Sequence, residues 1–574
     1  MDNMRNMVLA VVLMALVLFG WPVLMERFFP TPQPATPAAS THAPATPGEP
    51  HTAAPATPNA ESPAATRNRA VVLRETPRVA IRTPNLEGSI NLKGARLDDL
   101  VLTGYRETIA KNSPPIRLLS PAGTPDTYFA SFGWAGDGVA LPGKDTLWTA
   151  NATTLAPGKP VTLSWTNPQG LRFALRLAID DGYMFTVDQS VTNGSGAPVS
   201  IRPYGLVSRV GVSKDPDTHT IHTGPMGVFN GRANYSVNFK TLDGEGAAGS
   251  RFSTTGGWLG FTDKYWLTAL IPDQKAAVDA SFRAGPNKSY QADFTSPATS
   301  VAPGATAQSV SRFFAGAKEV NLLDRYENKA DIPLFSKAID WGWFEILEKP
   351  IFKVLDWLFR AVGNFGVAII LLTVLVRGLM FPIAQRQFAS MAAMRAIQPK
   401  MKALQERYKG DKPKLQQEMM ELYKKEKVNP LAGCLPIFLQ IPIFYALYKV
   451  LMLTIEMRHQ PFIFWIKDLS APDPLTPVNL FGLLHFTPPG FLAIGVLPIL
   501  LGVTMYFQFK LNPQPMDDMQ KQVFSIMPWI FMFIMAPFAA GLQLYWATTN
   551  ILTILQQKWL YSRHPSLTQA PAKK

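Results

Sequence analysis

FGVAIILLTVLVRGLMFP, residues 365–382, is the stretch of sequence that decides the fold, because it is apolar apart from Arg377. As a helix, its 18 residues would be about 27 Å long, close to the ~30 Å hydrocarbon core of a bilayer. Two more mostly apolar runs follow, at residues 430–453 and 491–509. Charged residues make up 17% of the chain, against about 25% in ordinary soluble domains. The sequence therefore predicts a membrane protein.

The last apolar run lies between Lys521 and Lys558 and has 36 residues without a charge. A single helix of that length would measure about 54 Å, which is too long for one ordinary crossing. Pro537 and Gly541 offer a break in the run. We therefore expect two short spans joined by a tight turn.

The N-terminal region predicts an anchor followed by a tether. Residues 7–25 are uncharged and long enough to span a bilayer, and the run ends without the small-residue site of a cleaved signal peptide. In residues 31–66, 27 of 36 positions are Pro, Ala or Thr, a composition that forms an extended linker and no packed core. With this anchor, the sequence predicts six transmembrane helices.

Between the tether and residue 330, apolar residues recur with a period of two. Apolar and polar or small residues alternate over residues 171–179, and alternation resumes at residue 183 after the turn Asp180-Asp181-Gly182. Two alternating runs around a short Gly-containing loop predict a β-hairpin. Frequent Gly, Pro, Asn and Thr extend this prediction to a large antiparallel sandwich.

The basic residues near the spans predict the orientation. Residues 385–428 carry eleven Lys/Arg against five Asp/Glu, a net charge of +6, whereas residues 456–490 have a net charge of −1. The basic segment and the tail after residue 560 are therefore expected in the cytoplasm, together with the N-terminus. The β domain is expected on the opposite, periplasmic side.

The expected organisation follows the chain from the N-terminus. It comprises an anchor helix (1–29), a Pro/Ala/Thr-rich linker (30–69), an all-β domain (70–330), an amphipathic interfacial helix (333–362), a second span (363–384), a cytoplasmic helical hairpin (385–428), a third span (429–455), a periplasmic loop (456–490), a fourth span (491–510), a cytoplasmic loop (511–522), the fifth and sixth spans (523–560) and a cytoplasmic tail (561–574).

Composition and motifs argue against several kinds of site. The single cysteine, Cys434, excludes an intrachain disulfide and a cysteine-based metal cluster. Residues 244–249 match a dinucleotide-binding pattern, but no helix follows and the βαβ frame is missing. Residues 138–144 match most of a phosphate-binding loop, but Asp145 replaces the required Ser or Thr and Pro142 lies inside the loop. His219 and His222 should lie on opposite faces of a strand. No cofactor, metal, catalytic residue or specific nucleic acid is expected, and the net charge of +14 suits an anionic membrane surface.

Arg377 allows two interpretations that the residues alone leave open. A charge at mid-depth in a membrane costs about 2.5–3.5 kcal/mol on insertion scales. The guanidinium could reach the cytoplasmic interface by snorkelling, because Pro382 is only five residues away. Alternatively, it lies in a wet cavity whose counter-charge arrives with a substrate, since no acidic residue occurs in the later spans.

Several motifs resemble the YidC family of membrane protein insertases. They include residues 373–378 (TVLVRG), 394–400 (MRAIQPK), 426–436 (EKVNPLAGCLP) and 541–546 (GLQLYW). The resemblance implies five core helices around a hydrophilic groove centred on Arg377, with a periplasmic β-supersandwich related in shape to carbohydrate-binding domains. It also implies insertion and folding of inner-membrane proteins, alone or with the Sec translocon. This is a chaperone-like binding function and not catalysis.

The resemblance and the polar residues of the spans give three sets of candidate residues. The expected groove residues are Arg377, Thr373, Gln440, Gln543, Thr549 and Asn550. The expected contacts with substrate spans are Pro436, Ile441, Phe444, Tyr545 and Trp546. Docking of ribosomes and targeting factors is expected on the basic hairpin at Arg395, Lys400, Lys402, Lys424 and Lys425. Membrane lipids and nascent membrane proteins are the other expected partners.

Two alternatives come from other functional classes. A transporter could use Arg377 as an anion site, but the inverted repeats typical of such proteins are not found in the sequence. A carbohydrate-binding or carbohydrate-processing β domain could use carboxylates such as Asp180 and Asp181, although turn chemistry explains these residues.

Overall fold

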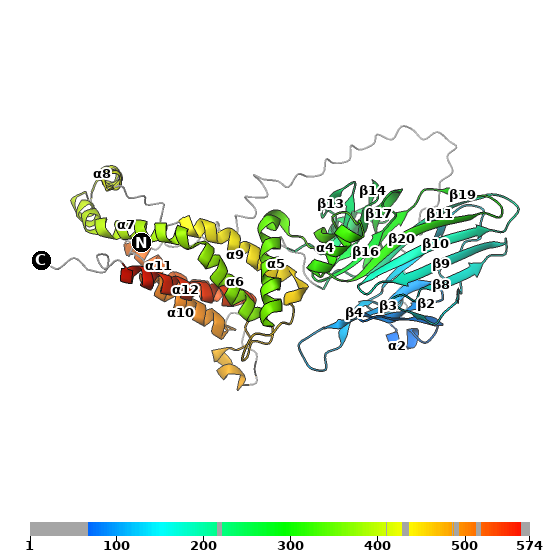
Figure 1. The fold of residues 1–574 in the computed structure, drawn as a ribbon, viewed down its shortest axis with the longest axis horizontal. Coiled ribbons are helices and arrows are strands. Elements are labelled where there is room, and N and C mark those ends of the chain that lie inside the picture. Colours follow the sequence, from blue (N-terminus) through cyan, green and yellow to red (C-terminus); the bar gives the residue numbers. More distant parts are fainter. Residues whose placement is uncertain are drawn as a thin grey trace. The chain divides into compact units, whose positions relative to one another are not determined.

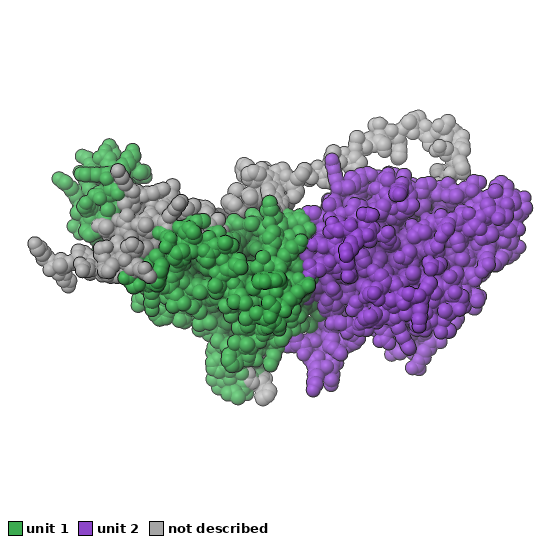
Figure 2. Space-filling view, in the orientation of Figure 1, with its two compact units in different colours: residues 1–40, 341–452, 456–574 green, residues 41–340, 453–455 purple. Residues whose placement is uncertain are grey.

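The computed structural model describes residues 67–214, 221–408, 410–426, 435–484, 486, 493–511 and 518–563. The expected anchor, almost all of the linker, Cys434 and the end of the tail lie outside these residues. Arg395 and Pro436 belong to helical segments whose side chains are not described. The chain forms two compact units, which Figure 2 distinguishes by colour. We call described residues 67–340 the β unit and those from 341 onward, apart from 453–455, the helical unit.

The described part of the β unit contains two sheets of eleven and nine strands (Figure 1). The first has the order β14 (Ser250–Thr255), β17 (Ala277–Gly285), β18 (Ser289–Thr295), β11 (Val199–Val210), β5 (Tyr128–Ala135), β3 (Arg96–Arg106), β2 (Leu86–Asn91), β1 (Arg78–Arg82) and β7 (Thr154–Leu155), with β19 (Thr299–Val301) on β11 and β4 (Pro115–Leu119) on β3. The second has the order β13 (Arg232–Asn234), β12 (Gly224–Phe229), β15 (Trp258–Thr262), β16 (Trp266–Ile271), β20 (Thr306–Ala317), β10 (Met184–Asn193), β9 (Leu171–Ile179), β8 (Val161–Thr166) and β6 (Thr149–Ala150).

The β9–β10 hairpin has the register that the alternating sequence predicts. Phe173 pairs with Val191 and Leu177 with Val187, and all four side chains are buried. The two sheets pack face to face. Phe132 on β5, for example, contacts Phe313 on β20 with ring centroids 6.2 Å apart. Burying such side chains contributes about 1.5–3 kcal/mol each. The β-sandwich prediction is confirmed.

Short helices cover the edges of the sandwich: α2 (Arg69–Val72), α3 (Phe239–Glu245), η1 (Pro286–Lys288), α4 (Val320–Lys329) and η2 (Phe335–Ala338). The expected helix over residues 333–362 begins only at Glu345. Phe335 instead fills an aromatic cage formed by Trp258, Phe314 and Tyr326. The left-handed backbone of Leu334 (φ 52°) also interrupts any helix there, so tertiary packing overrides the helical spacing.

The helical unit consists mainly of η3 (Gly342–Phe344), α5 (Glu345–Val362), α6 (Phe365–Leu379), α7 (Phe381–Arg407), α8 (Lys412–Lys425), α9 (Leu435–Leu453), α10 (Val496–Leu511), α11 (Asp518–Met535) and α12 (Ala540–Arg563). The chain breaks between α11 and α12 at residues 536–539, around Pro537. By length and hydropathy, no helix in the described part of the chain qualifies as a membrane span. The six spans therefore stay a prediction.

Candidate functional site

Arg377 lies in the last turn of α6 and is half-buried. The helix begins at Phe365 because the side chain of Asn364 caps it, accepting a hydrogen bond from the backbone N–H of Val367 at 3.1 Å. It ends at Leu379, and α7 begins two residues later. Arg377 is thus one turn from the junction of two helices, where the backbone changes direction.

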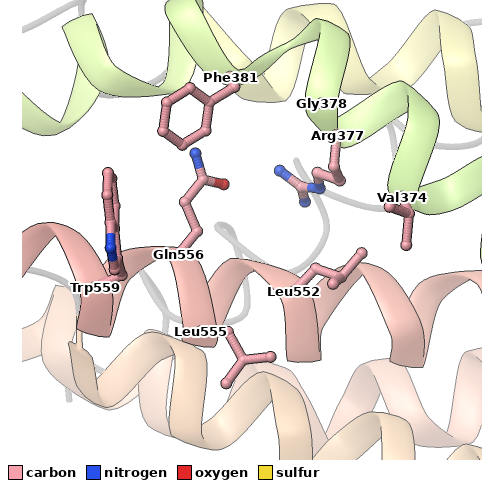
Figure 3. A pocket seen from close by; sticks show the side chains of 8 residues that line it. All are labelled: Val374, Arg377, Gly378, Phe381, Leu552, Leu555, Gln556 and Trp559. Atoms are coloured by element: carbon pink, nitrogen blue, oxygen red, sulfur yellow. The ribbon is translucent and has the colours of Figure 1, made fainter.

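The guanidinium of Arg377 points into a hollow of about 390 Å³ between α6, the start of α7 and α12 (Figure 3). The lining residues are Val374, Arg377, Gly378, Phe381, Leu552, Leu555, Gln556 and Trp559. Phe381 and Trp559 contact each other with ring centroids 5.9 Å apart. The hollow is therefore apolar except for the guanidinium and the amide of Gln556.

Among the described residues, no ion pair includes Arg377. The phenol of Tyr545 on α12 is close enough to interact with it electrostatically. An unpaired guanidinium beside apolar side chains favours the arrival of an anionic group, because the guanidinium offers five hydrogen-bond donors and a full charge.

Residues expected to contact substrate spans come together on α9 and α12. The amide of Gln440 donates a hydrogen bond to the hydroxyl of Tyr545 at 2.6 Å. The rings of Phe444 and Trp546 meet edge to face, with centroids 4.5 Å apart. Ile441 lies beside them in sequence and is 54% exposed. These contacts form a polar and an aromatic link between the two helices.

Four other expected groove residues lie inside the helical unit: Thr373, Gln543, Thr549 and Asn550. Thr373 is buried, and its hydroxyl donates to the Ile369 carbonyl at 2.6 Å. Asn550 donates to the Thr504 hydroxyl on α10 at 3.1 Å. Thr549 is buried one residue before it on α12. The hydroxyl of Thr373 and the amide of Asn550 are therefore hydrogen-bonded inside the unit.

Gln543 is fully buried at the turn between α11 and α12. Its amide nitrogen donates to the carbonyls of Met535, Ala536 and Phe538 at 2.9, 3.3 and 2.8 Å. Met535 is the last residue of α11, so its carbonyl has no intrahelical partner, and Ala536 and Phe538 belong to the turn that follows. Gln543 therefore closes a helix end, and its amide nitrogen is fully occupied.

The loop after α9 closes the end of the helical unit where α10 and α12 begin. The backbone N–H groups of Ala540 and Gly541, which start α12, donate to the carbonyls of Ala471 and Leu469 at 2.8 and 2.9 Å. The Asn364 amide donates to the Phe462 carbonyl at 2.9 Å. The loop thus supplies partners for backbone and cap groups of two helices.

Asp473 is the buried carboxylate of this closed end. It accepts hydrogen bonds from the Trp465 indole at 3.0 Å and from the backbone N–H groups of Leu475 at 3.0 Å and Leu497 at 2.7 Å. Leu497 belongs to the first turn of α10, where a negative charge is favoured by the helix dipole. Gly495 leaves the necessary room, because a Cβ there would lie 2.5 Å from the Cβ of Asp473.

The expected docking residues lie on α7 and α8. These helices pack through a small core in which Ile397 and Met401 contact Met419, Leu422 and Tyr423. Lys400 pairs with Glu426 at 2.6 Å. Lys402, Lys424 and Lys425 are exposed. The hairpin therefore presents exposed positive charges on a small apolar core.

Comparison with known proteins places the chain in one family. It is 53% identical over 561 residues to a "Membrane protein insertase YidC" from Zymomonas mobilis, which covers 98% of this chain and 95% of that protein. A protein of the same name from Methylobacterium sp. is 50% identical over 88% of this chain and 82% of its own length. The chain belongs to the YidC family.

Two family models divide the chain within α5, about 15 residues after the boundary between the two compact units. The "YidC periplasmic domain" matches residues 78–354, and the "60Kd inner membrane protein" matches residues 357–567. A solved structure titled "Active YidC insertase crystal structure with the first transmembrane domain resolved" covers 84% of this chain and 92% of its own, at 19% identity and a TM-score of 0.36. That score is too low to support a comparison of details. This YidC family member is an inner-membrane protein with a periplasmic domain, and its relatives disfavour the transporter and carbohydrate alternatives.

The motifs that resemble the YidC family do not include the residues of α12 that line the hollow opposite Arg377. Leu552, Leu555, Gln556 and Trp559 follow the helical spacing i, i+3, i+4 and i+7, so they lie on one face of α12. That spacing was present in the sequence. It did not stand out because the surrounding run is apolar on most sides.

Proposed function

We propose that this chain inserts membrane proteins into the inner membrane and assists their folding, through a groove centred on Arg377. The observation that carries the proposal is the half-buried guanidinium of Arg377, which faces a hollow between α6 and α12 and forms no ion pair within the described part of the chain. The YidC relatives named as insertases support the same activity. No cofactor is required, because substrate hydrophobicity and the membrane potential provide the driving force.

The helical unit spans the membrane in this proposal, with six helices including the N-terminal anchor. Large apolar side chains exposed away from the hollow support this placement: Leu371, Leu375, Leu379, Leu500, Phe507, Phe524, Ile526, Trp529, Ile530, Phe533, Ile534 and Ile551. Such a surface is costly in water and favourable against lipid. Both termini and the α7–α8 hairpin lie in the cytoplasm, and the β unit lies in the periplasm.

The guanidinium acts by holding the polar or acidic extracytoplasmic segment of a substrate part-way across the membrane. Moving an uncompensated charge through hydrocarbon costs several kcal/mol or more, and a fixed opposite charge reduces that penalty. The membrane potential contributes about 2.3 kcal/mol per charge per 100 mV. Arg377 therefore lowers a barrier and releases the segment once the substrate span has entered the lipid.

The substrate span itself passes along α9 and α12. Ile441 is exposed there beside the Gln440–Tyr545 hydrogen bond and the Phe444–Trp546 ring contact. An apolar substrate helix would pack on Ile441 and on the aromatic pair, while polar groups of the segment that follows it would meet Gln440 and Tyr545. Pro436 belongs to the same path.

Partners are proposed on two surfaces. The exposed lysines of the hairpin, including Lys402, Lys424 and Lys425, suit ribosomes and targeting factors, whose RNA and acidic segments are attracted by positive charge. Arg395 belongs to the same surface. The Sec translocon is the proposed partner for larger substrates, with nascent membrane proteins and lipids at the helical unit.

Substitution of Arg377 tests the proposal. Insertion of substrates with acidic or neutralised leaders is measured in vesicles containing wild type, Arg377→Lys or Arg377→Ala. We expect Arg377→Ala to insert the acidic substrate at least tenfold less efficiently than wild type, which corresponds to about 1.4 kcal/mol. Arg377→Lys should keep most of the wild-type activity on the same substrate. The neutral substrate should be much less affected, since it gains little from a cation.

The matched control is Arg360→Ala, which removes an exposed arginine of α5 that pairs with Asp356 at 2.8 Å. It should leave both substrates near wild-type activity. Equal activity of Arg377→Ala and wild type on the acidic leader would contradict the proposal and support simple snorkelling. Strong failure of Arg377→Lys would point to bidentate hydrogen bonding as the essential contribution.

A further inference from the structure

Residues 474–509 form a run of 36 residues without a charged side chain, apart from one histidine, but α10 begins only at Val496. More than half of this run therefore precedes the helix. Its described part contains the 3₁₀ turn η6 (Pro477–Gly482) and the residues that follow it. We call residues 478–484 and 486 the apolar turn.

The apolar turn exposes almost all of its large side chains. These are Val478, Leu480, Phe481, Leu483, Leu484 and Phe486, with Leu483 76% exposed. In Figure 1 the turn projects from the helical unit near α10. A contiguous exposed apolar patch of this kind marks an interaction surface.

Part of the backbone of the apolar turn is hydrogen-bonded within the loop itself. The N–H groups of Phe481 and Leu484 donate to the carbonyls of Thr476 and Asn479 at 2.9 and 3.0 Å. Leu480 and Phe481 both adopt left-handed conformations (φ 49° and 58°), which non-glycine residues rarely adopt in succession. The strained turn thus directs apolar side chains outward while these N–H groups have acceptors, which lowers the cost of entry into hydrocarbon.

A second apolar tip is carried by the same loop. Ile463 and Phe464 are exposed, and Phe464 stacks on Trp465 with ring centroids 6.1 Å apart. The indole of Trp465 donates to Asp473, the residue that holds the start of α10. Both tips are therefore attached to the closed end of the helical unit.

We infer that the apolar turn inserts into the periplasmic leaflet of the membrane and that its occupant is lipid acyl chain. This inference rests on the proposed membrane placement of the helical unit. Lipid is favoured over a protein partner, because protein interfaces surround an apolar centre with a polar rim and hydrogen bonds. The run supplies no Asp, Glu, Lys or Arg side chain for such a rim, and the helix in which it ends, α10, also exposes Leu500 and Phe507.

The insertion sets the depth of a short helix. The 16 residues of α10 are about 24 Å long, less than the ~30 Å hydrocarbon core. A helix of that length is accommodated by a thinner bilayer or by flanking anchors. The apolar turn provides such an anchor on the side where α10 begins.

Fluorescence quenching tests the inference in phosphatidylethanolamine–phosphatidylglycerol vesicles. Single cysteines labelled with bimane are placed in a Cys434→Ser background as Phe481→Cys and Leu483→Cys. Ile530→Cys on the exposed face of α11 is the membrane reference, and Ala197→Cys on the β unit is the aqueous reference. Circular dichroism of each variant verifies that it is folded.

We expect doxyl-labelled lipid to quench positions 481 and 483 at least half as strongly as position 530, and iodide to quench them less than half as strongly as position 197. Quenching by iodide alone at the turn, with position 530 quenched by lipid, would overturn the inference and leave the membrane placement intact. Protection from both quenchers would mean that protein covers the turn, which also overturns it. Absence of lipid quenching at position 530 would refute the membrane placement and, with it, the inference.

Discussion

The two units of this molecule distribute their apolar side chains in opposite ways. The β unit hides Phe173, Phe185 and Phe313 between its sheets and exposes few large apolar residues among those described. The helical unit exposes Leu379 to 68% and Phe533 to 52%, while it buries Gln543 and Asn550. The difference teaches how each unit treats its solvent: the β unit has the pattern of a domain surrounded by water, and the pattern of the helical unit agrees with our proposal that lipid surrounds it.

The largest expected effect comes from removing a ring from the β unit. Phe313→Ala should lower the free energy of unfolding by about 3–5 kcal/mol, because it leaves a cavity between the sheets. Val310→Ala is the matched control, since Val310 is exposed on the same strand, β20, and should change stability by less than about 0.5 kcal/mol. Guanidinium unfolding followed by far-UV circular dichroism measures both. If the two substitutions had equal effects, Phe313 would not lie in the core between the two sheets.

An intermediate effect is expected from the buried polar group at the closed end of the helical unit. Asp473→Ala should destabilise that unit by about 1–3 kcal/mol, because the backbone N–H groups of Leu475 and Leu497 lose their acceptor. Asp473→Asn keeps the shape but turns one acceptor into a donor, so it should also destabilise the unit. Thermal unfolding in detergent, monitored by the helical signal, measures the loss. A fully stable Asn variant would mean that shape alone holds the loop.

The smallest expected effect comes from the exposed face of the helical unit. Phe533→Ala should change the unfolding free energy in detergent by about 0.5 kcal/mol or less, because the ring contacts solvent or lipid on one side. The same substitution type therefore has very different consequences at Phe313 and Phe533. Denaturation of both variants under one condition makes the comparison. A loss at Phe533 as large as that at Phe313 would place it in a packed core.

Sequence patterns predicted the elements whose formation depends on residues close together in the chain. The β9–β10 hairpin follows from strict alternation, and the break near Pro537 from the length of an uncharged run. The aromatic cage around Phe335 depends on Trp258 and Phe314, far away in sequence, so its helical spacing was misleading.

The candidate site, like the fold, was predictable from the sequence only in part. Arg377 stood out as a lone charge, and the structure adds its hollow. The pairing of Gln440 with Tyr545 and the closing of a helix end by Gln543 depend on how helices pack, which side-chain spacing in an apolar run does not specify.

The three hydrogen bonds of Gln543 have a consequence for the order in which this part of the protein can fold. Gln543 and the three carbonyls that accept from it are separated by only five to eight residues, so the turn between α11 and α12 can close before any distant segment is in place. The carbonyls at this turn are thus covered by a local event that does not wait for α10 or for the loop after α9.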